Sequence, residues 1–298
     1  MSAWSRRRFA KLAGAAGLTA AARVARPVRA GAAVQGRVVV IGGGLGGATA
    51  AKLIARDSPG LDVTLVEPAP RYVTPFFSNL YLGGLRPIEM LSHGYGALRE
   101  KYGVRLIHAR AVDIDPAARK VRLSDGARLA YDRLVVAPGI GIRAEAIEGY
   151  DAAATQAMPH AWGGGAQLEL LKRQLDAMAD GGLVLMAVPQ RPYRCPPAPY
   201  ERAALIAGYL KRHKPRSKIL IVDSKDSFPL QDLFEDGWYR FAEGLIEWLP
   251  GEFNGGGVKA VDVRARRVMT EDEAFGGDVI NLIPPQRAGD IARAAGLA

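Results

Sequence analysis

One βαβ-like segment near the amino terminus constrains the fold more than any other part of the sequence. Residues 37–41 (Arg-Val-Val-Val-Ile) form a short β-branched run, typical of a strand buried on both faces of a parallel sheet. Residues 42–47 (Gly-Gly-Gly-Leu-Gly-Gly) follow at once, a helix is predicted over 48–55, and a strand over 63–66 ends at Glu67. This order of strand, Gly-x-Gly-x-x-Gly, helix, strand and acidic residue predicts a dinucleotide-binding unit.

The residue types in this turn suit a dinucleotide. Gly42 permits a tight turn, Gly44 lets the backbone approach a pyrophosphate, and Gly47 allows close helix–strand packing. The helix amino terminus offers free N–H groups to the phosphates, and the Glu67 carboxylate can accept hydrogen bonds from a ribose diol. We therefore predict cofactor contacts at these four positions and at Gly46. An ordinary glycine-rich turn is the alternative, and the completeness of the unit disfavours it.

A later strand favours FAD over NAD as the dinucleotide. Two short strands are predicted over residues 111–115 and 120–123, and residues 131–139 (Tyr-Asp-Arg-Leu-Val-Val-Ala-Pro-Gly) read as an apolar strand that ends in a turn. This strand resembles the second FAD signature of glutathione-reductase-like flavoproteins, which ends in Ala-Thr-Gly, with Pro138 in place of Thr. An ordinary buried strand with a turn is the alternative. The FAD contacts predicted from this region are Val112, Ala137 and Gly139.

The second half of the chain predicts another unit of the same design. A helix is predicted over residues 168–178, a buried strand over 181–188, a helix over 200–211, and a strand over 218–222 that ends at Asp223. The predicted fold class is therefore α/β, with two Rossmann-like domains of the glutathione-reductase type.

The turn after the first strand of this second unit is unsuited to a nucleotide. Residues 189–199 (Pro-Gln-Arg-Pro-Tyr-Arg-Cys-Pro-Pro-Ala-Pro) contain five prolines and no glycine. Because prolines lack an N–H donor and fix the backbone, this turn cannot bind a pyrophosphate through its amides. The second domain is thus predicted to keep the architecture and to lack a nicotinamide site.

The only cysteine of the sequence, Cys195, lies in this turn. A thiolate there is expected to be stabilised by the amino terminus of the following helix and by the nearby Arg191, Arg194 and Arg202. Glu201, at the start of that helix, is a candidate proton acceptor. We predict Cys195 and Glu201 as catalytic residues and predict no metal site. A buried, inert cysteine in a proline-rich crossover is the alternative.

The amino terminus has the layout of an export signal. Residues 5–11 (Ser-Arg-Arg-Arg-Phe-Ala-Lys) match the twin-arginine pattern, and a mildly apolar run follows over 12–22. Residues 28–30 (Val-Arg-Ala) offer a cleavage site. We therefore expect a signal peptide over 1–30 and a periplasmic mature protein, with a basic tail as the alternative.

The charge of the mature chain excludes one class of partner. The formal net charge is +10, and the first 30 residues contribute seven basic side chains and no acidic one, which leaves +3. A charge that small gives no strong electrostatic case for a nucleic-acid partner.

Four segments without a glycine motif carry a family resemblance. They are residues 193–203 (Tyr-Arg-Cys-Pro-Pro-Ala-Pro-Tyr-Glu-Arg-Ala), 75–79 (Pro-Phe-Phe-Ser-Asn), 213–218 (His-Lys-Pro-Arg-Ser-Lys) and 283–289 (Ile-Pro-Pro-Gln-Arg-Ala-Gly). In this order they closely resemble the flavoprotein subunit of flavocytochrome c sulfide dehydrogenase.

The resemblance implies an FAD enzyme that oxidises sulfide and passes electrons to a c-type cytochrome subunit. Cys195 then corresponds to one member of a redox-cysteine pair, and Glu201 to an acidic residue near the flavin. Family members continue past the Pro-Pro-Gln-Arg stretch with the second cysteine, a Gly-Asp motif and an interface segment. The chain is therefore expected to be truncated before them.

The resemblance also implies a domain order. We expect the first part of the FAD domain over 31–150, the second dinucleotide-type domain over 151–275, and a return to the FAD domain over 276–298. No Cys-x-x-Cys-His is present, so a haem must lie on another chain.

Two alternative functions remain at this stage. One is a sulfide:quinone oxidoreductase-like enzyme of the membrane surface, although no amphipathic docking segment and no integral membrane segment is predicted in the mature chain. The other is a non-catalytic FAD-binding protein, which the single cysteine favours.

Overall fold

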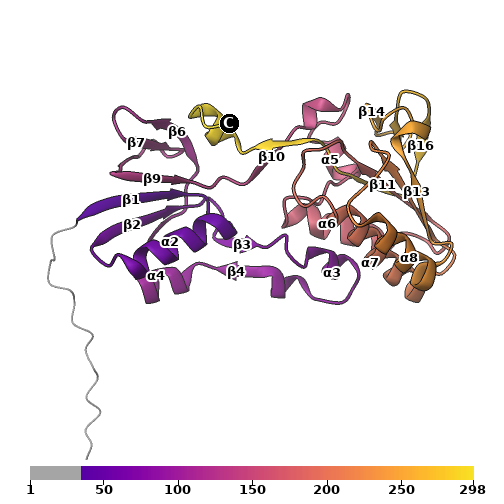
Figure 1. The fold of residues 1–298 in the computed structure, drawn as a ribbon, viewed down its shortest axis with the longest axis horizontal. Coiled ribbons are helices and arrows are strands. Elements are labelled where there is room, and N and C mark those ends of the chain that lie inside the picture. The colour runs from indigo at the N-terminus through magenta and orange to yellow at the C-terminus, as the bar shows by residue number, and fades with distance from the viewer. Residues whose placement is uncertain (1–34) are drawn as a thin grey trace, which may run out of the picture.

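The molecule has two lobes that lie side by side and are joined by two separate connections (Figure 1). The computed structural model describes residues 35–298. The predicted signal over residues 1–30 lies outside this described part.

The first lobe is built on a four-stranded parallel sheet. Its strand order is β5-β2-β1-β9, with β1 (Gly36–Ile41), β2 (Leu61–Val66), β5 (Arg105–Ile107) and β9 (Arg133–Val136). Helices α2 (Leu45–Asp57) and α4 (Gly96–Tyr102) cover one face, and the antiparallel strands β6 (Ala111–Asp115), β7 (Lys120–Leu123) and β8 (Arg128–Ala130) cover the other. The predicted strand–turn–helix–strand unit is confirmed.

The β-branched run of β1 explains why this strand lies at the centre of the sheet. Val38 and Val40 pack with Ala51 of α2 on one face, while Val39 and Ile41 pack toward β6 and β7 on the other. All four side chains are buried, because successive residues of a strand point to opposite faces and both faces are covered.

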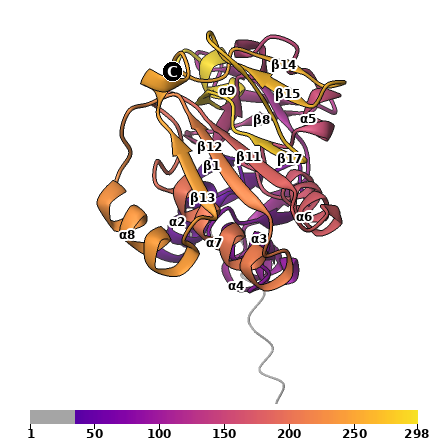
Figure 2. The ribbon, with the colours of Figure 1, turned by 90° about the vertical axis from the view of Figure 1, so that its right-hand side faces the viewer.

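The second lobe repeats the design with a second parallel sheet. Its order is β13-β12-β11-β17, with β11 (Leu183–Val188), β12 (Lys218–Asp223), β13 (Ile246–Leu249) and β17 (Val279–Leu282). Figure 2 shows the helices α6 (Ala166–Ala177), α7 (Ala198–His213) and α8 (Gln231–Ala242) below this sheet. Shorter elements complete the lobe: α5 (Ala154–Ala157) and the antiparallel strands β14 (Ala260–Asp262), β15 (Arg267–Met269) and β16 (Ala274–Gly276).

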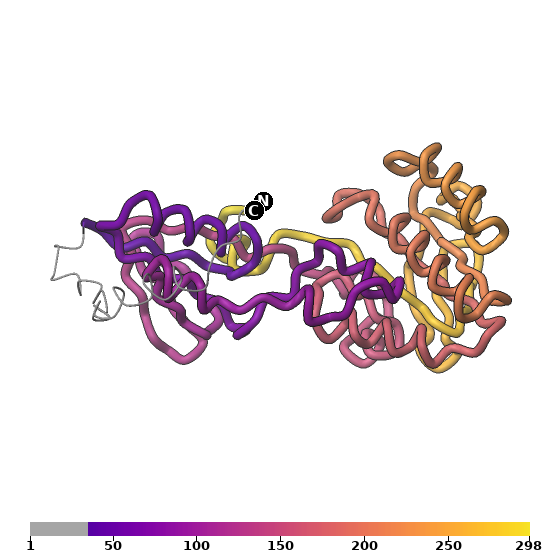
Figure 3. Tube along the Cα trace, turned by 90° about the horizontal axis from the view of Figure 1, so that it is seen from below, coloured from indigo at the N-terminus to yellow at the C-terminus, as the bar shows by residue number. Residues whose placement is uncertain are grey.

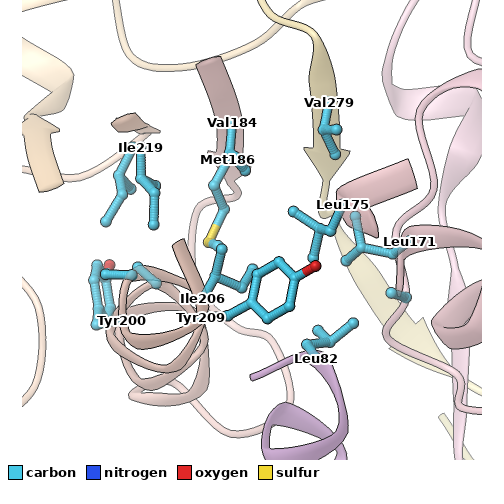
Figure 4. Close-up of a cluster of buried hydrophobic side chains, with 14 of the residues drawn as sticks. Leu82, Leu171, Leu175, Val184, Met186, Tyr200, Ile206, Tyr209, Ile219 and Val279 are labelled. Atoms are coloured by element: carbon cyan, nitrogen blue, oxygen red, sulfur yellow. The ribbon is translucent and has the colours of Figure 1, made fainter. Parts of the chain in front are cut away.

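A segment from the first half of the chain completes the core of the second lobe. Helix α3 (Ser78–Leu82) and the 3-10 helix Ile88–Leu91 contribute Leu82 and Leu91 to that core. Leu82 lies beside Leu171 and Leu175 of α6 in the close-up of the core (Figure 4). The sequence pattern does not predict this crossing, because it depends on packing between segments about 90 residues apart.

The chain crosses between the lobes on two sides. On one side, β10 (Ile140–Ile142) and β18 (Gln286–Ala288) pair antiparallel. On the other, β3 (Arg71–Val73) and β4 (Ser92–Gly94) pair antiparallel and flank α3 in sequence. Figure 3 shows both connections from below, as purple and yellow segments between the lobes.

The return to the first lobe starts later than expected. Strand β17 pairs with β11, so residues 279–282 belong to the second sheet, and the expected boundary at residue 276 is too early. All four side chains of β17 are buried, as expected for a strand of a parallel sheet that is covered on both faces. After β18, the short helix α9 (Asp290–Ala294) lies against β6 of the first lobe.

Candidate active site and FAD site

The tight packing of the first turn accounts for two of its glycines. Gly42 has a φ of +95°, and a Cβ there would lie 2.1 Å from the carbonyl oxygen of Ala137. A Cβ at Gly47 would lie 1.8 Å from the carbonyl oxygen of Gly42. Any side chain at either position would therefore break the turn or separate α2 from the sheet.

The glycine at position 44 has no such structural cause. Gly44 precedes α2 with a φ of −67°, which any residue can adopt, and the nearest atom to a Cβ there belongs to Tyr72 at 3.8 Å. Packing among the described residues thus leaves room for a side chain. A pyrophosphate lying against the backbone at the helix amino terminus would fill that room, so this turn fits a dinucleotide.

The Glu67 carboxylate is fixed in position beside the same turn. Its Oε2 accepts a hydrogen bond from the Gly43 amide at 2.7 Å, and its Oε1 accepts one from the Ala69 amide at 2.9 Å. Two carboxylate oxygens have about four acceptor sites. Both oxygens therefore keep capacity for the hydroxyl groups of a ribose.

A cavity of about 520 Å³ opens between the turn and α9. Of the predicted cofactor residues, Gly42, Glu67 and Val112 line it. Arg110 and Asp290 also line it and were not predicted, because neither belongs to a recognisable motif and Asp290 reaches the cavity only through the return of the chain.

The other predicted cofactor residues do not line that cavity. Gly46 is exposed on α2, and Gly44 faces a neighbouring hollow with Tyr72. Ala137 lies under the glycine turn, and Gly139, with a φ of +72°, accepts a hydrogen bond from the Gly289 amide at 3.0 Å. Ala137 therefore contacts Gly42, and Gly139 contacts Gly289, and these two glycines both line the cavity.

A buried donor lies between the two lobes without a partner. Gln286 of β18 accepts a hydrogen bond from the Arg194 amide through Oε1 at 2.9 Å. Its Nε2 is buried and has no hydrogen-bond partner within residues 35–298. A buried unpaired donor is costly, so Nε2 is suited to donate to a bound group at this junction.

A second cavity, of about 290 Å³, brings together the two predicted catalytic residues. Cys195 and Glu201 both line it, with Phe76, Phe77 and Trp162 as its aromatic walls. The segment of residues 75–79, which carried the resemblance without an assigned role, thus forms one side of this cavity.

Backbone strain is concentrated around this second cavity. Six residues other than glycine have a positive φ in the described part of the chain, and three of them line it: Phe77 (+64°), Ala161 (+51°) and Cys195 (+56°). Such conformations cost about 1–3 kcal/mol each and cluster at functional sites. The clustering supports a function for this cavity that is independent of the sequence motifs.

The environment of Cys195 differs in part from the prediction. The thiol is exposed, so the alternative of a buried cysteine is wrong. Arg194 and Arg202 line the cavity with it, whereas Arg191 does not, and its charge acts on the Lys225 ammonium instead. Burial lowers the pKa of Arg194 and lowers that of Arg202 to about 9.

Asp223, the acidic residue that ends β12, is hydrogen-bonded to side chains of its own lobe. Asp223 is fully buried, and its Oδ2 accepts hydrogen bonds from Tyr200 Oη at 2.5 Å and Trp248 Nε1 at 3.1 Å. Its Oδ1 pairs with the Lys225 ammonium. This carboxylate has no exposed edge for a ribose, which agrees with the prediction from the proline-rich turn that the second lobe lacks a nicotinamide site.

Two family models match the chain in succession. The model described as pyridine nucleotide-disulphide oxidoreductase matches residues 36–172, and the model of the central part of the sulfide dehydrogenase [flavocytochrome c] flavoprotein chain matches residues 168–284. The chain belongs to the pyridine nucleotide-disulphide oxidoreductase flavoproteins. FAD is its cofactor, in agreement with the prediction from the glycine turn.

Curated relatives of this flavoprotein include two sulfide-oxidising proteins. It is 32% identical over 242 residues to the sulfide-quinone reductase of Aquifex aeolicus. The aligned region covers 79% of this chain and 54% of that relative. It is 56% identical over 43 residues to the sulfide dehydrogenase [flavocytochrome c] flavoprotein chain of Chlorobaculum thiosulfatiphilum, which covers 14% of this chain and 90% of that one. The flavoprotein thus spans about half the length of the Aquifex relative.

The fold is shared with solved structures. The X-ray structure of the sulfide:quinone oxidoreductase from Aquifex aeolicus superimposes with a TM-score of 0.67 at 24% identity, over 87% of this flavoprotein and 61% of that chain. The predicted fold class is confirmed by this likeness. No helix within residues 35–298 has the length and apolar character needed to cross a membrane.

Proposed function

We propose that this flavoprotein oxidises sulfide at Cys195 beside FAD and passes the electrons to a c-type cytochrome subunit. The observation that carries the proposal is the second cavity, which is lined both by an exposed thiol in a strained turn and by Glu201. The match to the sulfide dehydrogenase flavoprotein model over residues 168–284, which contain both side chains, supports the sulfur substrate.

The proposed step joins two sulfur atoms. The Cys195 thiolate and HS⁻ form an S–S bond, the S–H bond breaks, and a persulfide, one proton and two electrons result. FAD supplies the two-electron acceptor for such a step. Arg194 and Arg202 give the cavity positive charge that favours the anionic reactants, and Glu201 can accept the proton.

Two observations bear on the electron acceptor. The partners of Asp223 and the glycine-free turn argue against a nicotinamide acceptor in the second lobe. The resemblance to the sulfide dehydrogenase flavoprotein then favours a cytochrome, with its haem on another chain. A quinone is the second candidate, because the sulfide-quinone reductase of Aquifex aeolicus is similar to this chain over 242 residues.

Stopped-flow reduction of the FAD-loaded protein tests the proposal. Sulfide should bleach the flavin of the wild type and leave that of the Cys195→Ala variant oxidised. Reoxidation by cytochrome c, compared with a short-chain quinone, then identifies the acceptor. A flavin spectrum that sulfide leaves unchanged in the wild type would make the chain a non-catalytic FAD-binding protein.

The number of turnovers is a separate outcome of the same assay. Cys195 is the only cysteine in the sequence, so no second thiol of this chain can release the persulfide. We expect one flavin reduction per protein without sustained reduction of cytochrome c. Sustained turnover by this chain alone would show that one cysteine suffices.

We also propose that the protein is exported by the twin-arginine pathway to the periplasm. Residues 5–11 supply the motif. Replacing Arg6 and Arg7 with lysine should leave the precursor in the cytoplasm, and unchanged periplasmic levels would contradict the proposal.

A further inference from the structure

The Glu201 carboxylate is held by a side chain that comes from the other half of the sequence. Asn79 of α3 donates through Nδ2 to Glu201 Oε2 at 2.5 Å and to the carbonyl oxygen of Ala198 at 3.2 Å. Asn79 is buried, whereas Glu201 is exposed. Within residues 35–298, Oε1 of Glu201 accepts no hydrogen bond. One carboxylate oxygen is therefore fixed and the other is free.

Arg202 determines which way the Asn79 amide points. Its Nε donates to Asn79 Oδ1 at 3.0 Å. A guanidinium can only donate, and an ionised carboxylate can only accept. The flipped amide would face the guanidinium with its NH₂ group and Glu201 with its oxygen, which replaces two hydrogen bonds by two repulsive contacts. With Arg202 in place, Nδ2 must face Glu201.

Arg202 is itself held in one position by neutral groups. It is only 2% exposed, and its guanidinium lies 4.8 Å from the ring centroid of Trp162. Its other acceptors are Asn281 Oδ1 at 2.8 Å, Ala161 O at 2.8 Å and His160 O at 3.2 Å. No carboxylate of the described residues forms an ion pair with it, and Glu201 is the carboxylate whose charge acts on it. A rigid, buried cation thus stands behind Asn79.

We propose that Asn79 and Arg202 are positioning residues that clamp Glu201 Oε2 and leave Oε1 as the proton-accepting atom. The inference rests on the proposed function. When the Cys195 thiolate and HS⁻ form the S–S bond, the proton of the broken S–H bond passes to Oε1, and the two electrons pass to FAD. Holding the carboxylate in one orientation raises the rate because a misplacement of about 1 Å can cost 10²-fold.

The test is a double-mutant comparison of the rate of flavin reduction by sulfide. Glu201→Gln should lower the rate by about 10²-fold or more, as expected for loss of a proton acceptor. Asn79→Ser should lower it by about tenfold. The double variant should be no slower than Glu201→Gln, because the clamp has no function without the carboxylate. Losses that multiply in the double variant would give Asn79 a merely structural role and overturn the inference.

A second variant removes the donor while it preserves the fold. Asn79→Asp keeps the volume and the acceptor for Arg202. It loses the Nδ2 donor toward Glu201 Oε2 and toward the carbonyl oxygen of Ala198, and it places a second carboxylate beside Glu201. It should show the same non-additive loss as Asn79→Ser. The matched control is Asn254→Ser, since Asn254 is also fully buried in the second lobe and donates to three backbone carbonyls. That variant should lose stability and keep the rate of flavin reduction.

Infrared spectroscopy gives a readout that needs no flavin. The carboxylate band of Glu201 is identified by subtracting the spectrum of Glu201→Gln. This band should shift in Asn79→Ser and stay in place in Asn254→Ser. If Glu201→Gln reduces flavin at the wild-type rate, both the role of Glu201 and this inference are overturned. If it is slow while both Asn79 variants behave as wild type, only the inference is overturned.

Discussion

The two βαβ units of this molecule share one architecture and use it in opposite ways. In the first, the turn after β1 is glycine-rich, and Glu67 at the end of β2 keeps acceptor capacity beside a cavity of about 520 Å³. In the second, the turn after β11 is proline-rich, and Asp223 at the end of β12 is fully buried under its own partners.

The difference shows that strand order and helix cover do not define a nucleotide site. The two parallel sheets have equivalent strand orders, but only the turn after β1 exposes backbone N–H groups to a ligand. In the second unit the turn before α7 carries an exposed thiol, Cys195. Under the proposed function, the first unit binds the cofactor and the second carries the reacting thiol.

The largest expected effect is on the rate of flavin reduction, and it should come from a change in the second turn that leaves FAD binding by the first turn intact. Cys195→Ala should slow sulfide-dependent flavin reduction by at least about 10⁴-fold, because the reacting sulfur is absent. The FAD content should equal that of the wild type, since the glycine turn is untouched. Absorbance at the flavin maximum measures both quantities. A variant that still reduces flavin would move the chemistry away from the second turn.

The buried acid of the second unit should matter for stability alone. Asp223→Ala leaves the Lys225 ammonium buried without its partner, and such a loss costs about 3–5 kcal/mol. Denaturant unfolding measures it, with Asp226→Ala, an exposed carboxylate just after β12, as the control. Tight NADH binding by the wild type would contradict the conclusion that only the first unit binds a dinucleotide.

The glycine turn of the first unit should tolerate no side chain in the path of the pyrophosphate. Gly44→Val is expected to weaken FAD binding by about 10²-fold, or about 2.7 kcal/mol, with little loss of fold, because no protein atom lies within 3.4 Å of the added Cβ. Gly237→Val on α8, where the space is also open, is the control. Stoichiometric flavin in the Gly44 variant would count against this interpretation of the turn.

A smaller effect concerns acid sensitivity of the second unit. Burial, with the charge of Arg202, lowers the pKa of His160 to about 4. Because the neutral form is favoured in the folded state, its contribution is complete above pH 6.5 and is lost as the pH falls toward 4. His160→Asn keeps an acceptor for the Trp162 amide, now made by Nδ1 at 3.0 Å, and should flatten that part of the curve. Parallel curves for both proteins would assign the loss to other groups.

The sequence predicted what depends on neighbours along the chain. The β-branched runs of β1 and β11 and the glycine turn act locally, so their strands, helices and FAD assignment could be recognised. Cys195 and Glu201 lie six residues apart across a helix start, so the sequence could pair them, and the structure adds the cavity that both line.

The rest of the site depends on contacts between distant segments. Asn79 meets Glu201 across 122 residues, and Arg202 meets Asn281 across 79. No local sequence pattern predicts such a long-range contact, because the sequence does not distinguish a buried asparagine from an exposed one. The later start of the return strand has the same cause, since β17 could be assigned only once its partner β11 was known.

The paired crossings between the lobes have a mechanical consequence. Pulling or twisting one lobe against the other loads β10 with β18 on one side and the α3 segment on the other, so no single peptide acts as a free pivot. A protease cut at one crossing would leave the halves tethered by the others. Leu82 and Leu91 would also have to leave the core of the second lobe before the two lobes could separate. Under force or limited digestion the molecule should therefore yield as one body.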